Sequence, residues 1–156
     1  MVRWFDGLYG GLIAGVTSAF FYAVVAVAWL HETTLAGFFA QVARALPVFR
    51  GTPDALPVVG LGVVLYFLLA GGLGVIYALL AKRLPSMWRA PTSVIWGLVY
   101  GLVVWFVLHD VLVPISGAID VQPMWEGLVG TVFFYGVVLS ELTTMAHRRG
   151  VDAAAP

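Results

Sequence analysis

The sequence predicts an all-α membrane protein: a bundle of four transmembrane helices with both termini in the cytoplasm and a short amphipathic interfacial helix in the first outer loop. Of its 156 residues, 62% are hydrophobic and only 10% are charged, whereas a soluble domain has about 25% charged residues. The apolar residues form four long stretches, and most Lys and Arg residues lie on one side of them. A surface this apolar needs lipid around it.

A membrane-crossing helix needs about 20 mostly apolar residues. The four stretches lie at about residues 7–30, 56–80, 92–113 and 127–146. We expect helices because every backbone N–H and C=O group within a bilayer must form a hydrogen bond inside the protein. The stretches also lack the alternation of apolar and polar residues that is typical of barrel strands.

A signal peptide begins with a positively charged segment, but Arg3 is the one basic residue before the first stretch. The stretch is also longer than the apolar core of a signal peptide. We therefore expect the first stretch to stay in the mature protein as a membrane helix. Residues 1–150 then form one transmembrane domain, and residues 151–156 form a short tail.

The basic residues orient these helices, because Lys and Arg concentrate on the cytoplasmic side of membrane proteins. Only Arg44 and Arg50 flank the stretches on one side. The other side carries the remaining six: Arg3, Lys82, Arg83, Arg89, Arg148 and Arg149. The distribution predicts cytoplasmic termini in a multi-pass protein of the cell inner (plasma) membrane.

The first outer loop, about residues 31–55, contains an amphipathic pattern. One side of a helical wheel holds its larger apolar residues, which are Leu35, Phe38, Phe39, Val42 and Leu46. Thr33 or Thr34 can cap the helix, Pro47 ends it, and residues 51–54 suit a turn. We expect a helix over about residues 34–46 that lies in the outer membrane interface as a connector. A lid or a docking face is the alternative.

Small residues at every fourth position let helices in lipid pack closely, and each stretch has such a line. The residues expected at these contacts are Gly7, Gly11, Gly15, Ala70, Gly74, Gly97, Gly101, Gly136 and Ser140. Such a line can face a helix of the same chain or a second copy. The similar segments at 7–12 (Gly-Leu-Tyr-Gly-Gly-Leu) and 97–102 (Gly-Leu-Val-Tyr-Gly-Leu) also leave open a duplicated two-helix hairpin.

Ionisable residues within membrane helices are the first candidates for function. Those expected near the outer mouth are His31, Glu32, His109, Asp110 and Glu126. Imidazole and carboxylate together can bind a metal ion, relay protons or, with two histidines, hold haem. We favour a hydrated, mutually paired cluster in which His31 and His109 approach one another, with no cofactor and no tightly bound metal. We expect Glu141, nearer the cytoplasm, to pair with Lys82 or Arg83.

Several function classes are excluded or disfavoured by what the sequence lacks. It has no cysteine, so disulfides and thiolate metal sites are excluded. It has no phosphate-binding loop, zinc-protease motif or serine-hydrolase motif. Its eight basic and eight acidic residues balance, which gives no reason to expect nucleic acid as a partner.

The first stretch contains Gly10-Gly11-Leu12-Ile13-Ala14-Gly15. The third contains Trp-Gly-Leu-Val-Tyr-Gly-Leu-Val-Val-Trp at residues 96–105 and closes with His109 to Pro114. Together with the long first outer loop, this layout resembles the YagU-like small inner-membrane proteins of bacteria. The resemblance implies a four-helix inner-membrane fold, no established enzymatic activity and no functional residues to carry over.

The sequence therefore favours a non-enzymatic structural or accessory subunit that packs against itself or a larger membrane complex. The alternative is a small metal- or proton-handling membrane protein that uses the outer cluster of histidines and carboxylates.

Overall fold

The computed structural model describes residues 4–29, 34–88, 92–112 and 124–152, and these residues contain no strand. Four helices are long and apolar enough to cross a membrane: Trp4–Val25, Leu56–Arg83, Thr92–Asp110 and Trp125–Arg149. Each of them overlaps one of the four predicted stretches. The prediction of an all-helical protein with four potential membrane spans is confirmed.

Three of the four spans change from α-helix to π-helix along their length. In chain order the helical elements are α1 (Trp4–Tyr22), a π-helical segment (Ala23–Trp29), α2 (Leu35–Arg44), a 3-10 turn (Pro47–Phe49), α3 (Leu56–Arg83), a 3-10 turn (Pro85–Trp88), α4 (Thr92–Phe106), a π-helical segment (Val107–Leu112), α6 (Met124–Val129), a π-helical segment (Gly130–Val137) and α7 (Val138–Asp152). The last three elements form the fourth span.

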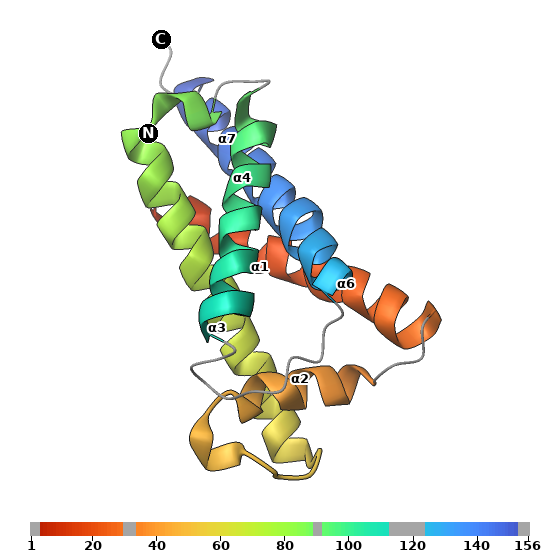
Figure 1. Cartoon of the computed structure of the whole chain (residues 1–156). Helices are drawn as coiled ribbons and strands as arrows, with labels where there is room; N and C mark the ends of the chain where they lie inside the picture. Colours follow the sequence, from red (N-terminus) through yellow and green to blue (C-terminus); the bar gives the residue numbers. More distant parts are fainter. Residues whose placement is uncertain (1–3, 30–33, 89–91, 113–123, 153–156) are drawn as a thin grey trace.

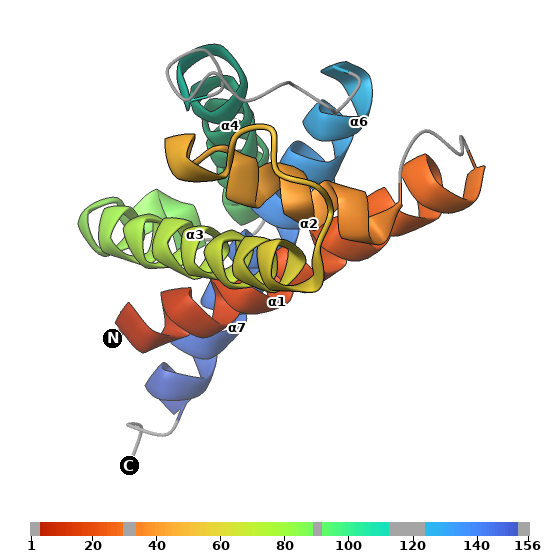
Figure 2. The ribbon, with the colours of Figure 1, turned by 90° about the horizontal axis from the view of Figure 1, so that it is seen from below.

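Neighbouring spans run in opposite directions. α1 packs along α3, and α4 packs along the fourth span, which also packs on α1. At one end of the bundle, the ring of His147 on α7 stacks on Trp88 of the turn after α3, with ring centroids 4.8 Å apart. α2 lies across the opposite end (Figures 1 and 2).

Glycines set the close approach of α1 to α3. A Cβ atom added to Gly11 would lie 2.9 Å from the Cα atom of Gly74, and one added to Gly74 would lie 2.7 Å from the Cα atom of Gly11. A Cβ atom on Gly15 would lie 2.8 Å from the Cβ atom of Ala70, and Gly7 faces Gly74 in the same way. The two backbones therefore touch, and no larger side chain fits between them.

The second pair of spans repeats this arrangement. A Cβ atom on Gly97 would lie 2.7 Å from the carbonyl oxygen of Gly136 and 2.9 Å from the Cβ atom of Ser140. A Cβ atom on Gly101 would lie 2.7 Å from the Cα atom of Val132. In each pair, two glycines four residues apart on the first helix meet a glycine of the second. The duplicated hairpin that the sequence left open stays a prediction.

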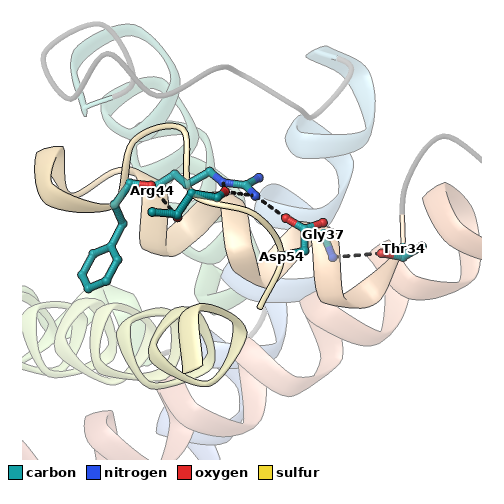
Figure 3. A network of polar contacts seen from close by, with 6 residues as sticks. Thr34, Gly37, Arg44 and Asp54 are labelled. Atoms are coloured by element: carbon teal, nitrogen blue, oxygen red, sulfur yellow. Dashed lines mark hydrogen bonds and ion pairs between the residues drawn. The ribbon is translucent and has the colours of Figure 1, made fainter. Parts of the chain in front are cut away.

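The loop between the first two spans contains α2, whose start is capped by Thr34. The backbone N–H of Gly37 donates to Thr34 Oγ1 at 3.0 Å (Figure 3). The buried residues of α2 are Gly37, Phe38, Phe39, Ala40 and Ala43.

The predicted apolar face of α2 is therefore only partly the buried face. Leu35 and Leu46 are 43% and 39% exposed. The small residues of α2 decide the packing, because they allow Phe39 to bring its backbone against Gly62 of α3. Leu35 and Leu46 are left on the outside of the protein.

Arg44 holds the segment after α2 in place. Its Nε and Nη2 atoms donate to the carbonyl oxygen of Thr52 at 3.0 and 2.7 Å, and Nη2 also pairs with Asp54 (Figure 3). Gly51 adopts a φ angle of +74°, which glycine tolerates without strain. The chain thus turns back and enters α3 close to where α2 ends.

Candidate functional site

The predicted outer cluster is only partly described. His31 and Glu32 lie outside the described residues, and so does any approach of His31 to His109. His109 is partly buried and stacks on Trp105 of the preceding turn, with centroids 4.9 Å apart, whereas Asp110 is exposed. Across residues 4–29, 34–88, 92–112 and 124–152, no three His, Cys, Asp or Glu residues lie close enough to hold a metal ion.

Among the predicted site residues that the structure describes, Glu126 has the surroundings that differ most from our expectation. We expected a hydrated carboxylate, but its side chain is 1% exposed. The cause is its position in the first turn of the fourth span, four residues before Gly130 and so on the same helix face. That face points toward α1, where Gly130 packs against Phe21 and Ser18. Glu126 is therefore a carboxylate inside the bundle.

Glu126 lines a cavity of about 110 Å³ between the helices. Lining residues come from α1, α2, α3, α4, the π-helical segments of the third and fourth spans, and α6. Most of the wall is apolar, and the lining residues with polar side chains are Ser18, Tyr22, Tyr66, Glu126, Thr131 and Tyr135. We refer to this cavity as the Glu126 pocket.

Three hydroxyl groups of the pocket donate their hydrogens to backbone carbonyls of other helices. Tyr135 donates to Ala70 at 2.6 Å, Tyr66 donates to Gly15 at 2.9 Å, and Ser18 donates to Gly130 at 3.2 Å. A hydroxyl that has used its hydrogen can still accept through its oxygen. These oxygens and the Glu126 carboxylate therefore present acceptors, which match a cation or a hydrogen-bond donor.

Two of the three described π-helical segments line this pocket. Gly130, Thr131 and Tyr135 belong to the segment of the fourth span, and Leu108 belongs to the segment of the third. π-helical turns inside α-helices occur often at functional sites, because the wider turn redirects side chains. In the fourth span the π-helical segment contributes three of the lining residues.

α2 covers the pocket through Phe38. The ring of Phe38 lies 4.4 Å from that of Tyr22 and 5.7 Å from that of Tyr66, measured between centroids. Phe39 packs against the same group, with its ring centroid 5.7 Å from that of Tyr66. Because Phe38, Tyr22 and Tyr66 all line the pocket, aromatic rings separate it from that end of the bundle.

Glu141 lies outside the pocket, and our expectation for it was wrong. Its Oε1 atom accepts a hydrogen bond from Ser93 Oγ of α4 at 2.9 Å. Lys82 and Arg83 are exposed at the end of α3, and among the described residues neither forms an ion pair with Glu141. Ser93 is buried where α4 meets the fourth span, so it reaches Glu141 first.

The sequence analysis missed the hydroxyl groups of the pocket, because it considered only ionisable residues as candidates. Ser18, Tyr66 and Tyr135 each lie inside an apolar stretch, and that position was the available signal. A buried hydroxyl needs a hydrogen-bond partner, so each of them pointed to a contact between helices.

Comparison with known proteins adds no relative: no family model, curated protein or solved structure matches the chain.

Proposed function

We propose that this protein is a non-enzymatic, multi-pass protein of the bacterial inner (plasma) membrane that binds a proton or a small cation at Glu126. The observation that carries the proposal is the burial of this carboxylate in a cavity that it lines together with the hydroxyl oxygens of Ser18, Tyr66 and Tyr135. Removing a carboxylate from water costs several kcal/mol unless charge or hydrogen bonds compensate it. Glu126 has an interaction partner in the folded protein, and a bound proton or small cation adds to that compensation.

The proposed orientation places this pocket toward the outer side. The six basic residues that we assign to the cytoplasmic side include Lys82 and Arg83 at the end of α3. Glu126 belongs to α6, which begins the fourth span on the side of the bundle where α2 lies (Figure 1), and it lines the same cavity as Phe38 of α2. In this orientation α2 lies at the outer interface, with Leu35 and Leu46 turned toward lipid.

The accessory-subunit role, with a second copy or a larger complex as partner, stays a prediction. It relied on the lines of small residues as contacts with another copy or protein. In the structure these lines contact helices of the same chain, with Gly11 against Gly74 and Gly97 against Gly136. The YagU-like resemblance likewise rests on the sequence motifs alone. The alternative function, restricted to protons and small cations, therefore has the stronger structural support.

Thermal unfolding of the purified protein in lipid nanodiscs tests the proposal. A ligand that binds only the folded protein stabilises it by about 2.7 kcal/mol at a concentration of 100 times Kd. We expect Na⁺, K⁺, NH₄⁺ or a lower pH to raise the unfolding temperature relative to choline chloride. Glu126→Gln should abolish this response.

Glu141→Gln is the matched control, because it changes the other carboxylate of the same span outside the pocket. It should keep the wild-type response. An equal response in Glu126→Gln, or no dependence on any cation or on pH in the wild type, would overturn the proposal.

A further inference from the structure

A second cavity lies between α3 and α4. Its volume is about 370 Å³, and all of its lining residues are aliphatic or aromatic except Met87. The Tyr100 hydroxyl donates to the carbonyl oxygen of Leu73 at 2.6 Å, so its hydrogen is not available to a ligand. The groove is open along one side, where the lining residues are between 41% and 53% exposed: Ile76, Leu80, Leu84, Val99, Val103 and Val107. We refer to this cavity as the α3–α4 groove.

The open side of the groove suits a hydrocarbon chain better than another helix. Helices that associate in lipid meet through small residues, because these let the backbones approach. The small-residue lines of α3 and α4 are already occupied, since Gly74 contacts α1 and Gly97 contacts the fourth span. The groove itself is lined mainly by bulky leucine, isoleucine, valine and aromatic side chains. A flexible acyl chain can follow such an uneven surface without a close backbone approach.

Arg83 lies at one end of the groove. α3 continues as one helix from Ile76, which lines the groove, to Arg83. Seven residues are close to two helical turns, so the two side chains leave the helix within about 20° of each other. Arg83 is exposed and, within the part of the chain that the structure describes, it forms no ion pair.

α4 adds to the positive potential at this end. It begins with Thr92 beside the end of α3, so the positive end of its helix dipole offsets the negative end of the α3 dipole. The groove therefore combines an apolar wall that is open to lipid with a positively charged end that attracts an anion.

We propose that the α3–α4 groove binds one acyl chain of an anionic phospholipid, whose phosphate group is held by Arg83. The lipid belongs to the leaflet at the C-terminal end of α3, which is the cytoplasmic leaflet in the proposed orientation. A guanidinium group binds phosphate through two parallel hydrogen bonds, and basic sites between membrane helices bind anionic lipid head groups. Arg83 does not line the Glu126 pocket, so this lipid site does not depend on the proposed function.

The length of the groove matches this occupant. On α3 it extends from Leu69 to Leu84, which is about 22 Å at 1.5 Å per residue. One leaflet contributes about 15 Å, half of the hydrocarbon core of a bilayer. An acyl chain whose phosphate is held at Arg83 can therefore lie along the groove through the whole depth of its leaflet.

Photolabelling of the full chain in nanodiscs tests the proposal. The probe is a phosphatidylglycerol with a diazirine in the middle of one acyl chain, and the comparison probe is the phosphatidylcholine with the same chains. We expect the phosphatidylglycerol to label peptides of α3 and α4 around Ile76, Val99 and Val103 severalfold more than the phosphatidylcholine does. Lipid-facing positions of the other spans should be labelled equally by the two probes.

One pair of variants tests the head-group contact. Arg83→Gln should reduce phosphatidylglycerol labelling of the groove to the phosphatidylcholine level. Lys82→Gln is the matched control, because it removes the same charge from the neighbouring position, and Lys82 leaves the helix about 120° away from Ile76. It should keep the preference for phosphatidylglycerol.

A second pair tests the chain contact. Val103→Phe fills the groove and should reduce its labelling by phosphatidylglycerol severalfold. Val64→Phe is the control, because Val64 is 55% exposed, Val103 is 53% exposed, and Val64 does not line the groove.

Equal labelling of the groove by the two probes would show ordinary surrounding lipid and would overturn the proposal. So would an equal loss in Arg83→Gln and Lys82→Gln, which would indicate general charge attraction. Absence of groove labelling by either probe would show that a protein surface, such as a second copy of the chain, covers it, and the proposal would again fail.

Discussion

Gly74 and Gly72 occupy the same helix but meet different surroundings. Gly74 touches the backbone of Gly11, whereas nothing lies within 4 Å of a Cβ atom on Gly72. Gly74→Ala should lower stability by about 1–3 kcal/mol, the usual cost of overpacking. Gly72→Ala should be neutral or stabilising, because alanine favours helix by up to about 1 kcal/mol. Denaturant unfolding in mixed micelles measures both, and equal effects would contradict the described α1–α3 contact.

Tyr135 links the fourth span to α3 through its hydroxyl group. Tyr135→Phe removes the buried hydrogen bond to Ala70 and should cost about 1 kcal/mol of stability. It also removes an acceptor from the pocket, so cation-dependent stabilisation should weaken. Tyr9→Phe, at an exposed position of α1, is the control and should change neither quantity. A Tyr135→Phe variant with full stability and full cation response would argue against this pocket geometry.

At the scale of residues, sequence reasoning found Glu126 but not its environment. The residue was a candidate because it is ionisable and precedes an apolar stretch. Its burial depends on the face that the fourth span turns toward α1, which Gly130 and its contacts with Ser18 and Phe21 determine. Such a rotation follows from packing between helices and cannot be deduced from the stretch alone.

The segment after α2 should depend on Arg44. Its guanidinium group joins α2 to Thr52 and Asp54. Arg44→Ala should speed amide hydrogen exchange at Thr52, whose N–H donates to Phe49 at 3.2 Å, and should cost at most about 1 kcal/mol because Asp54 is exposed. Arg50→Ala removes an exposed arginine of the same segment and should leave exchange unchanged. Unchanged exchange in Arg44→Ala would remove the role we assign to this contact.

At the scale of elements, length and apolar content were sufficient to find the four long helices. The rotation of α2 was predicted poorly, because the prediction weighted Leu35 and Leu46 as buried residues and ignored how closely Gly37, Ala40 and Ala43 approach α3. The π-helical segments were not predicted at all. Two of them contribute residues to the pocket, and apolar periodicity carries no signal for a π-helical turn.

The topology of the whole molecule rests on the distribution of charge. We predict that a reporter fused to the C-terminal tail is cytoplasmic and that one inserted at about residue 120 is external. The reason is the six-to-two distribution of Lys and Arg. Alkaline phosphatase and fluorescent-protein fusions measure the two positions in cells. An external tail would reverse the proposed orientation and place the Glu126 pocket on the cytoplasmic side.

The small-residue lines show what the whole molecule adds to the sequence. Gly11 and Gly97 indicated close helix contacts, but their partners could have belonged to another copy. The structure pairs them with Gly74 and Gly136 of the same chain. Choosing between the two arrangements requires knowing which helices are neighbours, and that information is absent from any single stretch.

The central claim is that Glu126 is a buried carboxyl group that binds a proton or a small cation. Carbodiimides that dissolve in lipid modify protonated carboxyl groups in apolar surroundings, and mass spectrometry identifies the modified residue. We predict that Glu126 is modified in the wild-type protein and that the cation which stabilises the fold protects it. Modification confined to Glu141 or other carboxyl groups, or modification of Glu126 that no cation prevents, would contradict the account.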